Sequence, residues 1–389
     1  MLSTQISTLK NRILFLPLLL LWGCSDNSVG EAEQHSWPQF RGDAAMTGYT
    51  SVNLPKNPTL LWSYKSGART SSSPVVYNQT AYWCDKRGKV YGVDIAGKLA
   101  FTCDFQTAVE ATPAIYDSVL YAGRIDGFMS AISLATGDTI WNFETMGQIS
   151  AAPAIGDIEG RQAVIFGSYD SYLYCVDRQS GKLIRRFESG YYLNGAVALW
   201  EGYFVFGGCD AWLRIISSEA GAPSDSLKLD TYIPASPAIE GGCCYIADHS
   251  GNVYEVAIEK GKIIRSRKIA EATSESATFV SVPAVSKKTL FVLSDDRHLY
   301  AISREDGSIR WKYLQKGASG ESSPVVCRDK IIICSKSGVV SMLSAASGEL
   351  LWEYDTGETI TASPAVIAGA FFILTAKGTL LCFGEKGGA

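Results

Sequence analysis

Short apolar runs separated by polar turns make up the chain from about residue 37 to its end. Ala81–Cys84 is apolar and aromatic, a polar turn follows, and Val90–Val93 is apolar again. Ile331–Cys334 and Val339–Leu343 repeat this arrangement. Such runs, with turn residues every 8 to about 12 positions, predict short β-strands. Because no stretch of this body keeps a helical period, the pattern predicts an all-β fold.

A proline-containing element divides this body into periods. It reads Ser/Thr/Ala-Pro-Ala/Val, with Val282 in the first position of one copy, and recurs at Pro74, Pro113, Pro153, Pro237, Pro283, Pro324 and Pro364. In the one long gap we expect Gly195 to take the place of proline. The eight copies lie 39 to 46 residues apart, which leaves room for four short strands in each period. Repeats of about 40 residues with this content are typical of propeller blades. The sequence therefore predicts an eight-bladed β-propeller of four-stranded antiparallel blades.

The two ends of the body predict how the ring closes. Leu60–Tyr64 resembles an outer strand but precedes the first proline element, while the last period ends at Leu380–Phe383 without an outer strand. The N-terminal strand is therefore expected to complete the last blade, which leaves no open sheet edge. One ring over residues 37–389 then accounts for a length that would otherwise suggest two or three domains.

A Gly-x-x-x-Trp spacing recurs near the end of several periods, at Gly137–Trp141, Gly307–Trp311 and Gly348–Trp352. Other periods place different residues at the tryptophan position, namely Phe101, Arg185 and Arg265. Glycine suits the turn, and an indole has a large apolar ring and an N–H that needs a partner. We expect four tryptophans to dock one blade on the next: Trp62, Trp141, Trp311 and Trp352. Taken singly, each is equally explained as a core aromatic residue.

The longer frame around this spacing, clearest at Ala131–Trp141 and Ala301–Trp311, resembles the tryptophan-docking repeat of pyrroloquinoline-quinone-like eight-bladed propellers. The segment Trp37–Gly42 is similar to the one that starts many such propellers. The resemblance covers residues 37–389. It implies one of two branches: quinone-dependent dehydrogenases, or non-catalytic lipoproteins such as the propeller component of the outer-membrane β-barrel assembly machinery.

The N-terminus carries a targeting signal. Lys10 and Arg12 precede the apolar run Ile13–Leu21, and Gly23-Cys24 follows. This order predicts a signal peptide over residues 1–23, and the run is shorter than the roughly 20 residues that span a bilayer. Gly23-Cys24 resembles a bacterial lipobox, which implies a lipid on Cys24. The small, polar and acidic residues 24–36 predict a flexible tether.

Charge restricts the partners. The chain has 35 Lys+Arg against 39 Asp+Glu, a net charge of −4. A balanced, slightly acidic body argues against a nucleic-acid partner and against electrostatic docking to membranes or phosphate. We expect a monomer that touches the membrane only through its lipid anchor. Ser25 after the cysteine resembles lipoproteins sorted to the outer membrane, so the periplasmic side of that membrane is the predicted location, with the cell surface as the alternative.

No motif predicts catalysis. A quinone with an activating Ca²⁺ requires clustered oxygen ligands, a cationic partner and an aspartate base, and no such cluster is recognisable. Several dehydrogenases of the resembled family have adjacent cysteines beside the cofactor, and Cys243-Cys244 are adjacent here. They read as the start of a strand, where neighbours point to opposite faces. His249 and His298 are isolated turn residues. We therefore predict no catalytic residue, no metal and no bound quinone.

Binding is expected at one rim of the ring. In a propeller, the connections that enter the inner strands share a face with the turns that join the second and third strands. Tyr, Trp and Arg are frequent interface anchors. The candidate rim residues are Arg87, Arg124, Asp126, Tyr191, Tyr192, Trp212, His249, Phe279 and Arg297. The longest such loop, Glu271–Val282, is the best candidate for a specific contact.

The sequence thus predicts a lipid-anchored propeller that acts as a scaffold or adaptor for envelope proteins, with outer-membrane protein assembly as the favoured process. The first alternative is a quinoprotein oxidoreductase. The second is a propeller that binds a glycan or peptide in its axial funnel, with Tyr191, Tyr192 and Trp212 as stacking platforms.

Overall fold

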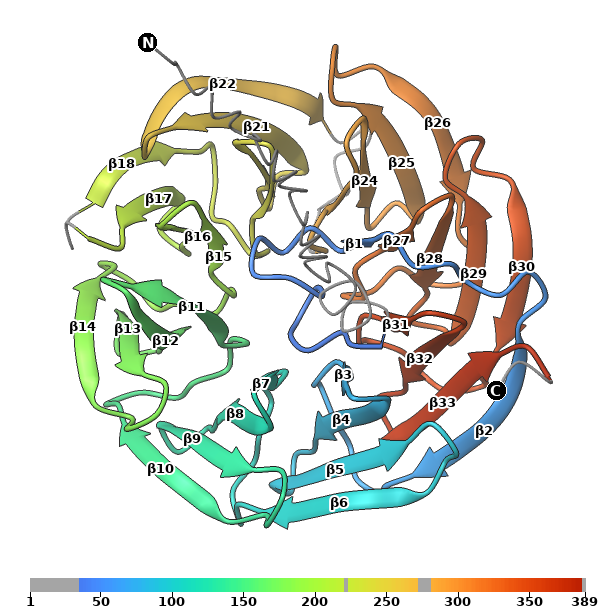
Figure 1. The fold of residues 1–389 in the computed structure, drawn as a ribbon. Helices are drawn as coiled ribbons and strands as arrows, with labels where there is room; N and C mark the ends of the chain where they lie inside the picture. The colour runs from blue at the N-terminus through green and yellow to red at the C-terminus, as the bar shows by residue number, and fades with distance from the viewer. Residues whose placement is uncertain (1–34, 220–222, 272–280, 387–389) are drawn as a thin grey trace, which may run out of the picture.

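Eight four-stranded blades are arranged around a central axis (Figure 1), and β1 (Tyr49–Thr50) adds a fifth strand to the sheet of one of them. The structure, a computed structural model, describes residues 35–219, 223–271 and 281–386. The regular elements of these residues are all β-strands, so the prediction of an all-β, eight-bladed propeller is confirmed. The signal peptide, Cys24, most of the tether and Phe279 lie outside the described residues. No helix long and apolar enough to cross a bilayer occurs within the described ranges.

Each blade runs outward from an inner strand near the axis. Blade 1 comprises β3 (Val75–Tyr77), β4 (Thr80–Cys84), β5 (Lys89–Asp94) and β6 (Leu99–Asp104); blade 2 comprises β7 (Ala114–Tyr116), β8 (Val119–Gly123), β9 (Phe128–Ser133) and β10 (Thr139–Glu144); blade 3 comprises β11 (Ala154–Ile158), β12 (Arg161–Gly167), β13 (Tyr172–Asp177) and β14 (Leu183–Glu188); blade 4 comprises β15 (Ala198–Trp200), β16 (Tyr203–Gly207), β17 (Trp212–Ser217) and β18 (Pro223–Lys228).

The second half of the ring follows the same order. Blade 5 comprises β19 (Ala238–Glu240), β20 (Cys243–Ala247), β21 (Asn252–Glu259) and β22 (Lys262–Glu271); blade 6 comprises β23 (Ala284–Val285), β24 (Thr289–Leu293), β25 (His298–Ser303) and β26 (Ile309–Leu314); blade 7 comprises β27 (Val325–Cys327), β28 (Lys330–Cys334), β29 (Val339–Ser344) and β30 (Leu350–Asp355); blade 8 comprises β31 (Ala365–Ile367), β32 (Ala370–Leu374), β33 (Thr379–Gly384) and β2 (Thr59–Lys65).

The ring closes as predicted. Strand β2 pairs antiparallel with β33, with Trp62 opposite Cys382 and Tyr64 opposite Leu380. The first long strand and the last strand of the described chain therefore share one sheet. This pairing supplies the outer strand that the last period lacks, so the ring has no gap between its first and last blades.

The predicted proline position of blade 4 is wrong. Strand β15 begins at Ala198, just as β11 begins at Ala154 after Pro153 and β19 begins at Ala238 after Pro237. The proline position of blade 4 is therefore occupied by Val197 and not by Gly195. The connection into this blade (189–197) is as long as those into blades 3 (145–153) and 5 (229–237). The extra length of this period lies in β11 and β12 of blade 3, which are longer than β7 and β8 of blade 2, and it moves the proline position two residues beyond Gly195.

The segment before β2 closes one end of the central channel (Figure 1, blue). Backbone groups between Trp37 and Asn53 bond to the inner-strand region of seven blades. The contacts are Trp37 with Val76, Pro38 with Ile115, Ala44 with Leu199, Ala45 with Ile239, Thr47 with Val285, Gly48 with Val326 and Asn53 with Gly369. Within it, β1 (Tyr49–Thr50) pairs parallel with β27. The segment thereby satisfies backbone groups that would otherwise face an open channel.

Arg41 holds this segment in place. Its side chain is 1% exposed, and it donates to the carbonyls of Pro324 at 2.7 Å and Pro283 at 3.1 Å. Gly48 lies directly against the guanidinium, where an added Cβ would come within 1.9 Å of Nη2. A side chain at residue 48 would therefore displace Arg41.

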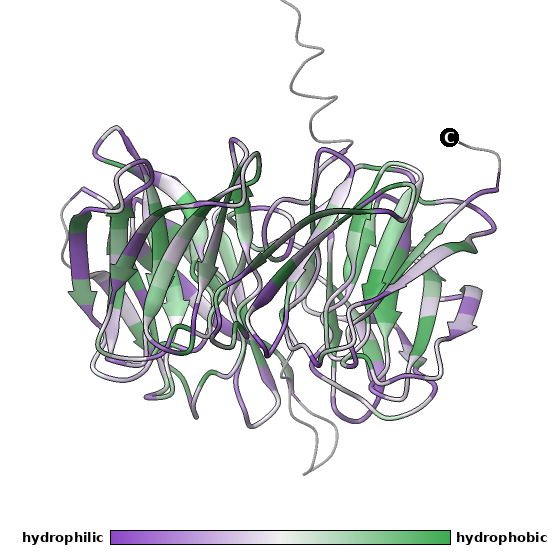
Figure 2. Cartoon of the chain, turned by 90° about the horizontal axis from the view of Figure 1, so that it is seen from below, coloured by the Kyte–Doolittle hydropathy of each residue, from purple (hydrophilic) through white to green (hydrophobic). Residues whose placement is uncertain are grey.

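The core lies between the sheets, where the apolar strands of neighbouring blades pack together and leave polar turns at both faces (Figure 2). The nine described cysteines are free. Burial raises the pKa of Cys334 and Cys382 to about 12, so these thiols act as small apolar residues. Strand β20 begins at Cys243, as predicted, and Cys243 and Cys244 form no disulfide.

Candidate functional site

Three indole N–H groups cross from one blade to the next. Trp62 donates to the carbonyl of Ile95 at 2.8 Å, and Trp141 donates to that of Arg178 at 3.0 Å. Trp311 donates to the carbonyl of Ala345 at 3.3 Å. Each acceptor lies just after the third strand of the next blade. The repeated tryptophan therefore fixes the distance between neighbouring sheets at equivalent positions.

Trp352 contacts its neighbour differently. Its ring packs edge-on against Phe371 and Phe383 of blade 8, with centroid distances of 5.8 and 5.3 Å. The contact between blades 7 and 8 is thus aromatic. These positions fix blade spacing and lie away from either end of the central channel.

Arginine replaces tryptophan at two junctions. Arg185 donates to the carbonyls of Ser218 at 3.2 Å and Glu219 at 2.8 Å in blade 4. In blade 5 the donor to the next blade is Arg267, which reaches the carbonyl of Arg304 at 2.9 Å. Arg265, at the predicted position, bonds instead to Glu255 of its own blade. The hairpin of β21 and β22 is longer than those of the other blades, and this shifts the docking residue by two positions.

A belt of hydroxyl groups links the blades close to the axis. The residue before the proline position carries a hydroxyl in five blades, as Ser73, Thr112, Ser236, Ser323 and Ser363. Every one of these oxygens accepts the N–H of the equivalent residue in the preceding blade, at 2.8 to 3.0 Å. This contact explains why Ser or Thr recurs before the proline, because it satisfies a buried backbone donor.

The belt surrounds an axial funnel with a volume of about 190 Å³. Phe40, from the segment that closes the channel, forms part of its floor. Its walls carry serine, threonine and asparagine side chains and the two carboxylates Glu110 and Glu321. Its described lining includes no lysine or arginine. We call the face onto which this funnel opens the funnel face.

Aromatic side chains gather on the funnel face between blades 3 and 5. The rings of Tyr169 and Tyr192 stack with their centroids 5.4 Å apart, and the ring centroids of Tyr191 and Tyr192 are 4.4 Å apart. In the next gap, Tyr232 stacks on His249 at 4.3 Å. The first gap thus brings together two predicted rim residues, Tyr191 and Tyr192, which are 42% and 45% exposed, and the second gap contains a third, His249. We call these five residues the aromatic rim. A hydrogen bond with Tyr192 raises the pKa of Tyr191.

The remaining rim candidates are not gathered into one site. Arg124 is ion-paired with Asp126 and lies over the rings of Phe105 and Phe128. Arg87 and Arg297 are exposed on the turns of blades 1 and 6. Trp212 begins β17 in blade 4 and is partly buried. They share a face with the aromatic rim but lie on different blades.

Carboxylates in the turns of this face are held by tyrosines. Tyr91 donates to Asp85 at 3.1 Å, Tyr174 donates to Asp170 at 2.7 Å, and Tyr254 donates to Asp248 at 3.0 Å. Burial, together with the neighbouring carboxylate, raises the pKa of Tyr91 to about 12, so it stays a donor. These aspartates order turns. The described residues contain no group of three or more His, Cys, Asp or Glu placed to hold a metal ion.

A quinone tricarboxylate fits this funnel poorly. Such a group needs cationic partners and oxygen ligands for Ca²⁺. The described funnel lining offers Glu110 and Glu321, which carry the same sign of charge as the cofactor. The absence of a bound quinone stays a prediction.

An eight-bladed propeller closed by its N-terminal strand, with inter-blade tryptophans, defines the class of protein. A family model described as outer membrane protein assembly factor BamB matches residues 51–198 and 214–389. This match covers most of the chain, so the chain belongs to that family.

Individual relatives are distant. Outer membrane protein assembly factor BamB of Escherichia coli is 22% identical over 359 residues, which are 86% of each chain. The crystal structure of BamB from Moraxella catarrhalis superposes with a TM-score of 0.71 at 18% identity, covering 85% of this chain and 99% of that one. A europium-containing methanol dehydrogenase gives a TM-score of 0.74 at 13% identity, covering 91% and 99%. At these identities the structural likenesses show the fold alone.

Proposed function

We propose that this chain is a non-catalytic scaffold that takes part in outer-membrane protein assembly and is held at the periplasmic side of the outer membrane by a lipid on Cys24. The family match supports the process. The aromatic rim supports the surface, because exposed Tyr side chains on rigid turns bury large area at low entropic cost. Residues Tyr169, Tyr191, Tyr192, Tyr232 and His249 are the proposed contact with a protein of the β-barrel assembly machinery.

The set of hydrogen bonds between the blades beneath this surface is the single observation that carries the proposal. Inter-blade docking and the hydroxyl belt hold the blades at fixed spacing. Loops on such a frame keep their positions when a partner binds, which lowers the entropic cost of association. A scaffold needs this property, whereas a catalyst also needs reactive groups that converge.

Site-specific photo-cross-linking in bacteria tests the contact. A photoreactive phenylalanine analogue at Tyr191 is expected to cross-link a component of the assembly machinery. The control position is Tyr116, which has the same exposed fraction of 42% but lies at the end of β7, at the opposite face. Equal yields at both positions, or a folded protein that gives no cross-link from Tyr191, Tyr192 or Tyr232, would refute the proposed surface.

The stacked tyrosines also favour a second candidate, a glycan or peptide held at the funnel. The triple substitution Y191A/Y192A/W212A separates the two candidates. If the rim binds a ligand only, ligand binding is lost while co-purification of envelope proteins survives. A scaffold contact predicts that co-purification itself falls.

The enzymatic alternative has a direct test. We expect no uptake when the purified chain is incubated with pyrroloquinoline quinone and Ca²⁺ and followed by absorbance and calorimetry. Stoichiometric uptake would replace the scaffold proposal with an oxidoreductase.

A further inference from the structure

Blade 5 has a carboxylate where the other blades have no charge. In blade 2 the register across the sheet is Tyr121, Ala131 and Trp141. The same register in blade 5 is Tyr245, Glu255 and Arg267. Equivalent positions elsewhere hold Gly92, Cys175, Ile215, Ala301, Met342 and Cys382. Glu255 is 2% exposed, so this charge is buried where the repeat places an uncharged residue.

The buried carboxylate is fully engaged inside the protein. Arg265 and Arg267 donate to its oxygens at 2.9 and 3.0 Å, and the Tyr245 hydroxyl donates at 3.0 Å. The same hydroxyl accepts from Nε of Arg304 at 2.7 Å. Arg304 also donates to three backbone carbonyls, at 2.7 to 2.9 Å. Glu255 therefore organises two arginines and orders a third through Tyr245.

More cations surround this network than it neutralises. A cleft of about 470 Å³ between blades 5 and 6 is lined by Arg265, Lys287, Lys288, Arg304 and Arg310, against the two carboxylates Glu255 and Glu305. Among the described residues, neither Lys287 nor Lys288 has an ion-pair partner, and Arg310 bonds only to the Thr289 hydroxyl at 3.3 Å. Three exposed cations thus converge on a cleft with a prearranged polar wall.

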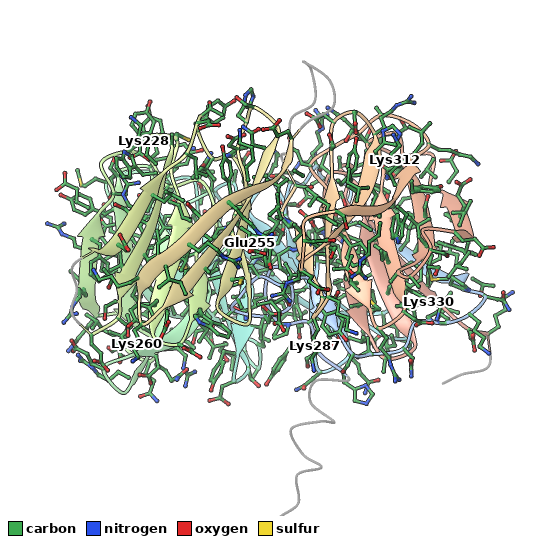
Figure 3. All side chains as sticks on the ribbon, turned by 90° about the horizontal axis from the view of Figure 1, so that it is seen from above. Lys228, Glu255, Lys260, Lys287, Lys312 and Lys330 are labelled. Carbon is green, nitrogen blue, oxygen red and sulfur yellow. The ribbon has the colours of Figure 1, made fainter. Side chains whose placement is uncertain are left out.

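The cleft opens on the face opposite the funnel. Lys287 and Lys288 lie in the turn between β23 and β24, and Arg304 follows β25. The chain enters its described part at the same face, where the N–H of Gln79, in the turn between β3 and β4, donates to the carbonyl of His35 at 3.4 Å. Figure 3 shows Lys260 and Lys287 at this face, Lys228 and Lys312 at the other, and Glu255 between them. We call it the entry face.

We propose that this cleft binds the phosphate group of an anionic ligand, with Lys287, Lys288 and Arg310 as its contacts and the Glu255 network as its support. Phosphate suits the site because several convergent donors match its oxygens, and the exposed lysines supply charge without needing a fixed geometry. The phosphate is that of a lipid headgroup or of a soluble compound. A headgroup would turn the entry face toward the membrane and leave the funnel face free for protein partners.

The sequence predicted no phosphate binding, because the chain has a net charge of −4. Net charge averages over the whole surface, whereas a phosphate responds to charges within about 10 Å at ordinary salt. The fold concentrates cations from two blades in one cleft.

Vesicle flotation tests the headgroup source. The chain from residue 25 on, produced without lipid, is mixed with vesicles of phosphatidylcholine and phosphatidylglycerol in equal parts, and with phosphatidylcholine alone. Binding to the acidic vesicles only is expected. The triple substitution K287Q/K288Q/R310Q should weaken it about a hundredfold, from roughly fivefold for each cation near an anionic surface.

The matched control removes the same charge from the funnel face, with K228Q/K312Q/K336Q. Figure 3 shows two of these lysines at that face. The control is expected to bind as the unmodified chain does, and both variants should unfold at the same temperature. Equal loss of binding in the two variants would overturn the proposal, because vesicle binding would then depend on the net charge of the protein and not on the cleft.

Calorimetry with inorganic phosphate and glycerol 3-phosphate tests the soluble source. Binding of these compounds without vesicle binding, lost in K287Q/K288Q/R310Q and kept in the control, identifies a soluble phosphate as the ligand. If neither vesicles nor these compounds bind, the cleft is no phosphate site. That outcome leaves the proposed protein contact at Tyr191 untouched, since the cross-linking experiment uses the opposite face.

Discussion

The junction between blades 2 and 3 and the junction between blades 5 and 6 perform the same task with different chemistry. In the first, the Trp141 indole donates to the carbonyl of Arg178. In the second, Arg267 donates to the carbonyl of Arg304, the residue of blade 6 that corresponds to Arg178 of blade 3. The first rests on apolar contact and the second on an ion pair between the buried Glu255 and the partly exposed Arg267.

The difference shows what the repeat requires. Both junctions keep one donor aimed at the same backbone carbonyl, so that donor is the common element. The apolar ring is replaceable by an arginine that has a carboxylate partner, which is the buried Glu255 at this junction and the exposed Glu159 at the junction of blades 3 and 4. Burying Glu255 carries a desolvation cost that an Ala–Trp pair avoids. The charged junction between blades 5 and 6 is therefore less favourable for stability than a tryptophan junction. A binding role for the surrounding charges would explain why it is present.

The largest expected effect comes from removing both arginines that pair with Glu255. R265Q/R267Q leaves a buried carboxylate without ionic partners and should lower the free energy of unfolding by about 3–5 kcal/mol, measured by urea denaturation.

The control is R185Q in blade 3, where the paired Glu159 side chain is 38% exposed. Exposed pairs contribute about 1 kcal/mol or less. If R265Q/R267Q costs no more than R185Q, the ion pair at the second junction is a surface interaction, and the comparison fails.

A smaller effect is expected at the turn glycines. Gly181, with φ of +66°, lies beneath Trp141, where an added Cβ would come within 2.5 Å of the indole. Gly307 is its counterpart at the other junction, with φ of +78° and no neighbour closer than 3.5 Å. Both substitutions to alanine carry a backbone cost of about 1–2 kcal/mol. G181A should add about 1–3 kcal/mol from overpacking.

Thermal and urea unfolding of the two variants measure this difference. Equal losses in G181A and G307A would show that the indole moves aside freely, and that Trp141 does not fix the spacing of blades 2 and 3.

The smallest effect isolates the indole N–H. W141F keeps an aromatic ring but removes the donor to Arg178, and should cost about 1–2 kcal/mol from the lost hydrogen bond and reduced volume. W352F loses the same atoms where no described residue accepts from the indole, so its cost should be smaller. A larger loss in W352F than in W141F would contradict a role for the hydrogen bond in docking.

Much of the fold could be predicted because its signals are local and repeated. The proline before each inner strand and the glycine before each outer strand recur in almost every period, and the strand order of a propeller follows the chain. The prediction was wrong where the first hairpin of blade 3 is longer, which moves the proline position from Gly195 to Val197. It was also wrong where the β21–β22 hairpin is longer, which moves the docking residue from Arg265 to Arg267.

The candidate sites were harder to predict from the sequence than the fold. Tyr191 and Tyr192 were recognised as rim residues because turns of known order share a face. Glu255 was missed, although comparing its position with Ala131 and Ala301 across the repeats would have marked it as a charge at an apolar position. The role of Arg41 had no such signal, since its acceptors Pro283 and Pro324 lie more than 240 residues away.

The sequence by itself determined the number of blades, the strands within each blade and the closure of the ring, because period, turn residues and apolar alternation act over short distances along the chain. Only the tertiary structure decided which charges meet. Lys287 and Arg310 belong to one blade and Arg265 to another, and their separation depends on how two twisted sheets pack. Electrostatic interactions follow distance in space, and distance along the chain does not report it.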